Sequence, residues 1–204
     1  MIKTNIKNPD LVRKRQKQIC RGSLKIFRKK GFHATSMREI ARSTGISLGN
    51  LYDYIEKKED ILFLVHKDIL EQISLQFDET VKNVGSPVEQ LVNGIREVVK
   101  YCSRIKEEIL FIFTETKSLE RKNLHEILRM ESEFVSKIDA LIERGVAKGV
   151  FQCQRPVALA NVIGYNLYIL AMRGWNILPF QSEHEFIDEL VRFSLKGLGV
   201  EDDQ

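Results

Sequence analysis

The sequence contains few of the residues that cross-link or interrupt a chain. Its three cysteines stand far apart, at positions 20, 102 and 153 of 204. Three scattered cysteines form neither a disulfide framework nor the close pairs of a metal site, so we expect a reducing cytoplasm and no metal or cofactor. Four prolines and twelve glycines are too few for a collagen-like, low-complexity or turn-rich all-β chain.

A long hydrophobic run is also missing. The longest candidate is the uncharged stretch 156–172, which has 17 residues and is interrupted by asparagine and tyrosine. This is short for a membrane span. The basic amino terminus has no apolar stretch behind it, which excludes a secretory signal. We therefore expect a buried helix and no membrane partner.

Positive charge is concentrated at the amino-terminal end. Residues 1–60 contain 15 Lys/Arg and 6 Asp/Glu, a balance of +9, whereas residues 61–204 contain 17 and 22, a balance of −5. Such asymmetry indicates a basic module that meets a polyanion, joined to a mildly acidic body. A solvated charged face is the simpler alternative, and a membrane surface would also suit a basic segment.

Helical signals fill almost the whole chain. Capping-box pairs at Ser36/Glu39, Ser86/Glu89 and Ser182/Glu185 predict three helix starts, and Gly31 predicts a helix end. Apolar residues at steps of three and four complete the pattern. The fold class is therefore all-α, with about nine helices, expected near residues 10–30, 37–44, 47–54, 57–77, 87–105, 109–119, 124–148, 156–178 and 182–198.

The second and third expected helices have the spacing of a helix-turn-helix. Ala41 is the small residue where the two helices cross, Gly45 allows the positive φ of the turn, and Leu51 is the apolar residue that fixes the second helix. Such a motif reads DNA by placing its second helix in the major groove. The basic residues around it favour that function.

The residues that surround this motif resemble the amino-terminal signature of the TetR family of bacterial transcriptional regulators. The resemblance rests on Gly31-Phe32, Thr35–Ala41 (TSMREIA), Gly45–Tyr52 (GISLGNLY) and Lys58-Glu59. It implies a ligand-responsive DNA-binding protein, most often a repressor, that binds a double-stranded operator as a homodimer. The implied domains are a DNA-binding domain at 1–56, with residues 1–9 as a flexible arm, and an effector-binding and dimerisation domain at 57–204.

The resemblance also implies which residues meet DNA. Leu48, Gly49 and Asn50 would face base edges, and an asparagine can pair with adenine through two hydrogen bonds. The remaining candidates would contact the DNA backbone: Thr35, Arg38, Ser47, Tyr52, Tyr54 and Lys58. Tyr52 and Tyr54 are expected on the exposed side of the helix, with helix packing as the alternative for Tyr52 and solvation as the alternative for Lys58.

In such a protein the body binds the effector and the last two long helices form the dimer. The uncharged stretch 156–172 and the apolar stripe of Ile187, Leu190, Val191 and Leu198 suit that interface. Polar groups among apolar ones suggest a small-molecule pocket, although ordinary helix ends would look the same. The candidate effector-binding residues are Phe113, Glu115, Asn166, Arg173 and Trp175. Hydrophobic drugs, acyl-coenzyme A thioesters and aromatic acids are all compatible effectors.

Two other classes of protein remain as alternatives. A sequence-neutral architectural DNA-binding protein would share the basic module, but it has no evident use for a large apolar body. An all-α cytosolic enzyme would need a catalytic motif. The four histidines are scattered, and there is no phosphate loop, zinc-binding helix or nucleophile motif. We therefore predict no catalytic residues.

Overall fold

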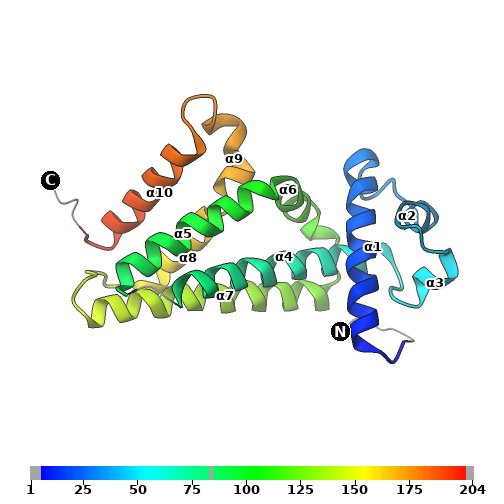
Figure 1. Cartoon of the computed structure of the whole chain (residues 1–204), viewed down its shortest axis with the longest axis horizontal. Coiled ribbons are helices and arrows are strands. Elements are labelled where there is room, and N and C mark those ends of the chain that lie inside the picture. Colours follow the sequence, from blue (N-terminus) through cyan, green and yellow to red (C-terminus); the bar gives the residue numbers. More distant parts are fainter. Residues whose placement is uncertain (1–5, 83–84, 201–204) are drawn as a thin grey trace. The chain divides into compact units, whose positions relative to one another are not determined.

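The computed structural model describes residues 6–82 and 85–200. Within these residues the chain has ten α-helices, one 3-10 helix and no strand, which confirms the all-α prediction (Figure 1). Residues 1–5 of the expected flexible arm lie outside the described residues, and residues 6–8 precede the first helix without regular structure. None of the described helices is both long and apolar enough to span a membrane.

The helix bounds follow local sequence signals. Ser36, Ser86 and Ser182 each accept a hydrogen bond from the backbone N–H of the glutamate three residues later, and each glutamate accepts one in return. All three predicted capping boxes are therefore confirmed. The helices are α1 (Pro9–Lys30), α2 (Met37–Thr44), α3 (Leu48–Tyr52), α4 (Lys58–Val81), α5 (Pro87–Arg104), α6 (Lys106–Glu115), η1 (Thr116–Ser118), α7 (Arg121–Ala147), α8 (Pro156–Asn166), α9 (Ile169–Ile177) and α10 (Glu183–Gly197).

Three helices differ from their predicted form. The helix expected over 47–54 ends at Tyr52. The single helix expected over 156–178 is divided into α8 and α9. At the break, the side chain of Asn166 donates to the carbonyl of Val162 at 2.8 Å. The helix expected over 109–119 begins earlier and ends as the 3-10 turn η1.

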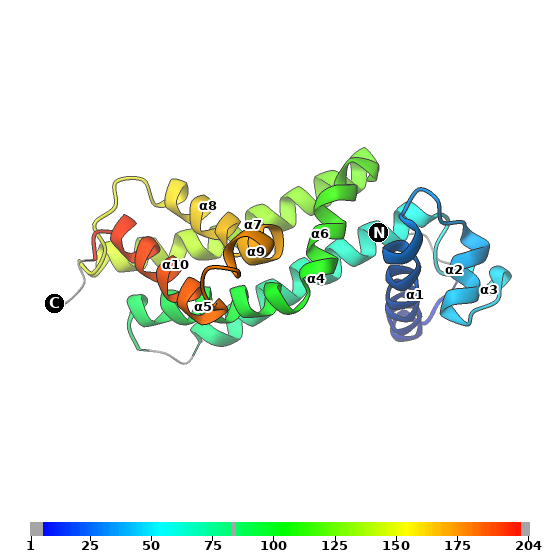
Figure 2. The same ribbon diagram turned by 90° about the horizontal axis from the view of Figure 1, so that it is seen from above.

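The chain divides into two compact units. The first contains residues 1–68 and 111–127, and the second contains residues 69–110 and 128–204. The first unit is built on α1, which packs against α2 (Figure 2). Its core includes Ile19, Phe27, Phe32, Ile40, Leu51, Ile55, Ile61 and Leu62. The functional boundary after residue 56 stays a prediction.

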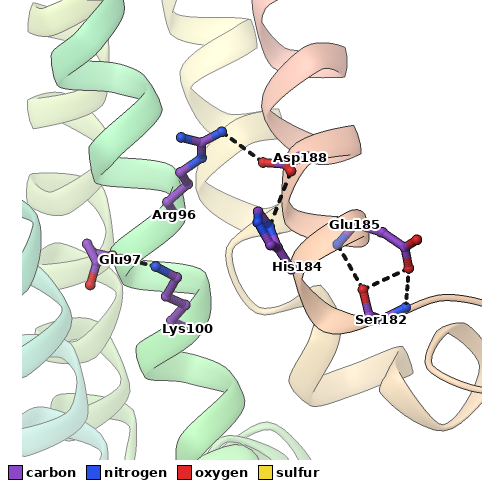
Figure 3. Close-up of polar contacts among 7 residues, drawn as sticks. All are labelled: Arg96, Glu97, Lys100, Ser182, His184, Glu185 and Asp188. Carbon is purple, nitrogen blue, oxygen red and sulfur yellow. Dashed lines mark hydrogen bonds and ion pairs between the residues drawn. The ribbon is translucent and has the colours of Figure 1, made fainter.

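In the second unit, α10 packs against α5 and α8. Arg96 of α5 donates to Asp188 of α10 at 2.8 Å, as Figure 3 shows, and Ser103 donates to Glu183 at 2.8 Å. This packing corrects one expectation. Ile187, Leu190, Val191 and Leu198 are at most 7% exposed within a single chain, so this stripe fills the chain's own core rather than a dimer interface.

Candidate DNA-binding interface

The helix-turn-helix is formed by α2, a three-residue turn and α3. Gly45 ends α2 in the left-handed region, with φ 70° and ψ 20°, a conformation that favours glycine. Ser47 then begins α3 by accepting a hydrogen bond from the backbone N–H of Asn50 at 3.3 Å. Between the helices, Ile40 and Leu51 are fully buried and Ala41 is 6% exposed. The predicted turn geometry is confirmed.

Helix α1 is hydrogen-bonded to the carboxyl-terminal end of α2 and to the residues just beyond α3. Gln18 donates to the carbonyl of Thr44 at 3.0 Å, at the end of α2, and Gln16 donates to the carbonyl of Tyr54 at 3.2 Å, just beyond α3. Ser43 donates to the carbonyl of Gly22 at 2.8 Å. A Cβ at position 22 would lie 2.7 Å from a methyl carbon of Thr44. The absent side chain therefore lets α1 and α2 approach closely.

Several of the predicted contacts form an exposed surface on α3. Ser47, Gly49 and Asn50 are exposed, Tyr52 is 47% exposed and Leu48 is half-buried. No atom lies within 4 Å of where a Cβ of Gly49 would be, so the backbone is open to a ligand at this point. Arg38 on α2 is exposed as well. These residues present amide, hydroxyl and cationic groups to a partner.

Three predicted contacts are placed differently. Tyr54 is 8% exposed, so the expectation that its side chain lies on the exposed side is wrong. Thr35 is 3% exposed, and its hydroxyl donates to the carbonyl of Gly31 at 2.7 Å. Lys58 is half-buried, and its Nζ lies 3.0 Å from the carbonyls of both Phe32 and His33. These side chains form contacts inside the protein.

The start of α4 is fixed by a carboxylate that sequence reasoning did not single out. Asp60 is 6% exposed, and its Oδ2 accepts from the backbone N–H groups of Glu56 at 2.9 Å and Lys57 at 3.1 Å. An acidic residue in the first helical turn was the available signal. Asp60 thereby fixes the turn that connects α3 to α4.

Glu39 connects the start of α2 to the end of α1. Its carboxylate accepts from Lys30 and from the backbone and hydroxyl of Ser36. The hydrogen bond from Lys30, followed by those from Ser36, lowers the pKa of Glu39 to about 2. The carboxylate is therefore ionised at neutral pH.

Residues from the later sequence also belong to the first unit. Phe111 stacks on Phe27, with ring centroids 5.3 Å apart and planes 11° apart. Glu115 lies 3.2 Å from His33, and Glu120 pairs with Lys57. The side-chain hydrogen bond to Glu120 raises the pKa of Lys57. No pattern in the sequence indicated these contacts, because the partners are more than 60 residues apart.

The candidate effector-binding residues are divided between the units. Phe113 and Glu115 belong to the first unit, and Asn166, Arg173 and Trp175 belong to the second. Trp175 is 72% exposed, and the guanidinium of Arg173 lies 5.3 Å from its ring centroid. The five residues therefore do not form a single cluster within either unit, and their role stays a prediction. In the described part of the chain, no group of three acidic, histidine or cysteine residues could hold a metal.

The geometry of α2 and α3 defines a helix-turn-helix DNA-binding protein, and comparisons with known proteins agree. Residues 19–65 match the family model described as bacterial regulatory proteins, tetR family. Residues 84–167 match the model described as tetracyclin repressor-like, C-terminal domain. Together these matches span more than half of the chain.

Individual relatives support the same family. The HTH-type transcriptional regulator HbdR of Aromatoleum sp. (strain CIB) is 25% identical over 188 residues, which cover 92% of this chain and 82% of the relative. A tetR-family regulatory protein from Rhodococcus RHA1 has a TM-score of 0.79 and 19% identity, covering 92% of this chain and 98% of that one. AibR, solved with isovaleryl coenzyme A and operator DNA, has a TM-score of 0.71 and 19% identity, covering 88% and 97%.

The chain therefore belongs to the TetR family and is a helix-turn-helix transcriptional regulator. The matched families are regulators rather than enzymes, which decides against the enzymatic alternative.

Proposed function

We propose that this regulator acts in the cytoplasm as a homodimeric repressor of a dyad-symmetric operator, and that a small amphipathic effector releases it from DNA. The observation that carries the proposal is the exposed surface of α3, on which Ser47, Gly49 and Asn50 stand free of the unit's core. A helix presented in this way fits the DNA major groove.

Each exposed group has a distinct role in this proposal. Asn50 pairs with a base edge, and Gly49 allows close approach of the helix to the groove. Ser47, Tyr52 and Arg38 contact phosphates, and Leu48 contacts a base. Thr35 and Tyr54 are left out because both are buried within the unit.

Variants at Asn50 and Arg38 test these roles. Asn50→Ala should reduce discrimination at one base pair of each half-site by roughly 1–3 kcal/mol. Arg38→Ala should weaken binding to every DNA sequence similarly, and should reduce the slope of log K against log salt by about 0.9. Fluorescence anisotropy with operator and scrambled duplexes, across a salt series, measures both effects. Equal affinity of the wild type for both duplexes would favour an architectural DNA-binding protein instead.

The dimer is inferred from exposed apolar side chains on α8 and α10, which pack against each other. On α8, Val157 is 57% exposed, Val162 43% and Tyr165 67%, and Phe193 on α10 is 64% exposed. Surfaces of this kind mark protein interfaces. A two-fold dimer would set its reading helices about one helical turn of DNA apart, roughly 34–36 Å, or a multiple of that distance.

Sedimentation of charged variants tests this interface. Phe193→Arg would bury an unpaired charge between the subunits, which costs several kcal/mol in order of magnitude, and it should produce monomers. Leu75→Arg is the matched control, because Leu75 is also exposed, at 44%, but lies on α4. A Phe193→Arg protein that stays fully dimeric would place the interface elsewhere.

For the effector we propose an acyl-coenzyme A thioester as the first class to test, because AibR was solved with isovaleryl coenzyme A. A ligand at 100 times its Kd should stabilise the folded protein by about 2.7 kcal/mol. Thermal unfolding and operator release should therefore respond to the same compounds. An aromatic acid and a hydrophobic drug are tested in parallel. If only one of these two compounds stabilises the protein and releases the operator, that compound's class replaces the thioesters as the proposed effector.

A further inference from the structure

Lys58 directs the hydrogen-bond donors of its side-chain ammonium at one loop of its own chain. Its Nζ lies 3.0 Å from the carbonyl oxygen of Phe32, 3.0 Å from that of His33 and 3.4 Å from that of Thr35. The same nitrogen lies 4.8 Å from the centroid of the Phe32 ring. A lysine ammonium has three N–H donors and no acceptor. The three carbonyls therefore match its whole donor capacity.

The loop that Lys58 contacts connects α1 to α2. It begins at Gly31, which has φ 85°, and it leads directly into the Ser36 cap of α2. The loop's own backbone provides one hydrogen bond, from Thr35 N–H to the carbonyl of Phe32 at 3.2 Å. Without the ammonium, the carbonyls of Phe32 and His33 would lose the donor that draws them together.

The ring of Phe32 is held beneath the same loop. Phe32 is 2% exposed, and its centroid lies 5.2 Å from that of Phe27 in an edge-on arrangement. The ammonium of Lys58 thus binds the backbone of the loop, while the side chain of Phe32 is buried in the core. Such convergent contacts define one conformation of the loop, and therefore one position for the start of α2.

We propose that Lys58 is a positioning residue for DNA recognition: it holds the 31–35 loop so that Arg38, in the first turn of α2, meets a phosphate. This differs from the phosphate contact expected from the sequence, because a phosphate would compete with three carbonyls for the same donors. The inference rests on the proposed role of Arg38 in DNA binding.

Two variants of Lys58 separate the possibilities. Lys58→Met removes the donors and keeps the length of the side chain, and it should weaken operator binding about 10-fold. Lys58→Arg keeps the charge but replaces the compact ammonium with a planar guanidinium, which binds phosphate well and does not reproduce three convergent bonds. We expect Lys58→Arg to lose affinity as Lys58→Met does. A Lys58→Arg protein with wild-type affinity would overturn the proposal.

A double-mutant cycle with Arg38→Ala distinguishes positioning from general destabilisation. If Lys58 positions Arg38 for its phosphate contact, the loss of affinity caused by Arg38→Ala should be several-fold smaller in the Lys58→Met background than in the wild type. Additive losses would overturn the proposal. Arg42→Ala is the matched control, since Arg42 is also exposed but lies in the last turn of α2, and its effect should be the same in both backgrounds.

Amide hydrogen exchange of the DNA-free protein gives an independent reading. Lys58→Met should accelerate exchange at residues 32–36 and leave the buried amides of α2 protected. Unchanged exchange in the loop would overturn the proposal. If Arg38→Ala alone leaves DNA binding unaffected, then the proposed role of Arg38 fails, while loop exchange still decides whether Lys58 holds the loop.

Discussion

The contact between α1 and α2 depends on the missing side chain of Gly22. In a Gly22→Ala protein the new Cβ would lie 2.7 Å from Cγ2 of Thr44, 3.0 Å from its Cα and 3.2 Å from the carbonyl oxygen of Ser43. Two of these three atoms belong to the backbone of α2, and threonine has a restricted rotamer. The Thr44 methyl group and the adjoining backbone of α2 must therefore shift by a few tenths of an ångström.

The size of the effect follows from two opposing contributions. Alanine in place of glycine favours a helix interior by up to about 1 kcal/mol, whereas overpacking a close contact costs about 1–3 kcal/mol. Since the backbone contacts cannot be relieved by a rotamer change, we expect a net loss of about 1–2 kcal/mol in the free energy of unfolding. Urea denaturation followed by circular dichroism measures this quantity.

Gly49→Ala provides the matched control. No atom lies within 4 Å of its new Cβ, so the free energy of unfolding should be unchanged or slightly higher. Operator affinity should nevertheless fall, because the methyl group would enter the DNA surface of α3. Thr44→Ser in the Gly22→Ala background should recover part of the stability, since it removes Cγ2 and leaves the backbone contacts. A Gly22→Ala protein as stable as the wild type would refute the close-approach reasoning.

The remaining predictions concern ionisable groups. The pKa of Glu39 is lowered to about 2, so its contribution to stability is present above the unfolded value of about 4.5 and is lost as the pH falls towards 2; Glu39→Gln should flatten acid unfolding in that window. Burial raises the pKa of Cys20 and of Cys102 to about 12, and the thiolate is the reactive form. A disulfide reagent at pH 8 should therefore modify Cys153 first in the native protein and all three thiols after denaturation, and rapid labelling of Cys102 in the native state would contradict its burial.

The features that sequence predicted well depend on neighbours in the chain. A capping box needs a serine and a glutamate three residues apart, and all three predicted pairs form the expected bonds. The turn at Gly45 likewise depends on the conformation of one residue. Short-range interactions of this kind are visible in the sequence, because the partners lie within a few positions of each other.

The features that sequence did not predict depend on distant partners. An apolar stripe on a helix shows that one face is buried, but it does not show what covers it. The sequence therefore predicts a second subunit over the stripe around Leu190, although the chain's own helices cover it. The sequence also predicts Tyr54 on the exposed side of a helix over 47–54, but α3 ends at Tyr52 and the side chain of Tyr54 is buried.

The charge of the amino-terminal segment shows how contacts with distant partners affect function. A balance of +9 over residues 1–60 suggests many phosphate contacts. Yet Lys17 pairs with Asp68, Lys30 with Glu39 and Lys57 with Glu120, and Lys58 binds backbone carbonyls. A cation already bound within the protein must give up that partner before it can neutralise a phosphate.

Arg38 and Arg42, in contrast, are exposed and have no ion-pair partner among residues 6–82 and 85–200. Salt dependence of DNA binding counts the phosphates that are neutralised, not the cations that are present. The slope should therefore be smaller than the charge of the segment suggests, and it should depend more on the arginines of α2 than on the two lysines at the start of α4.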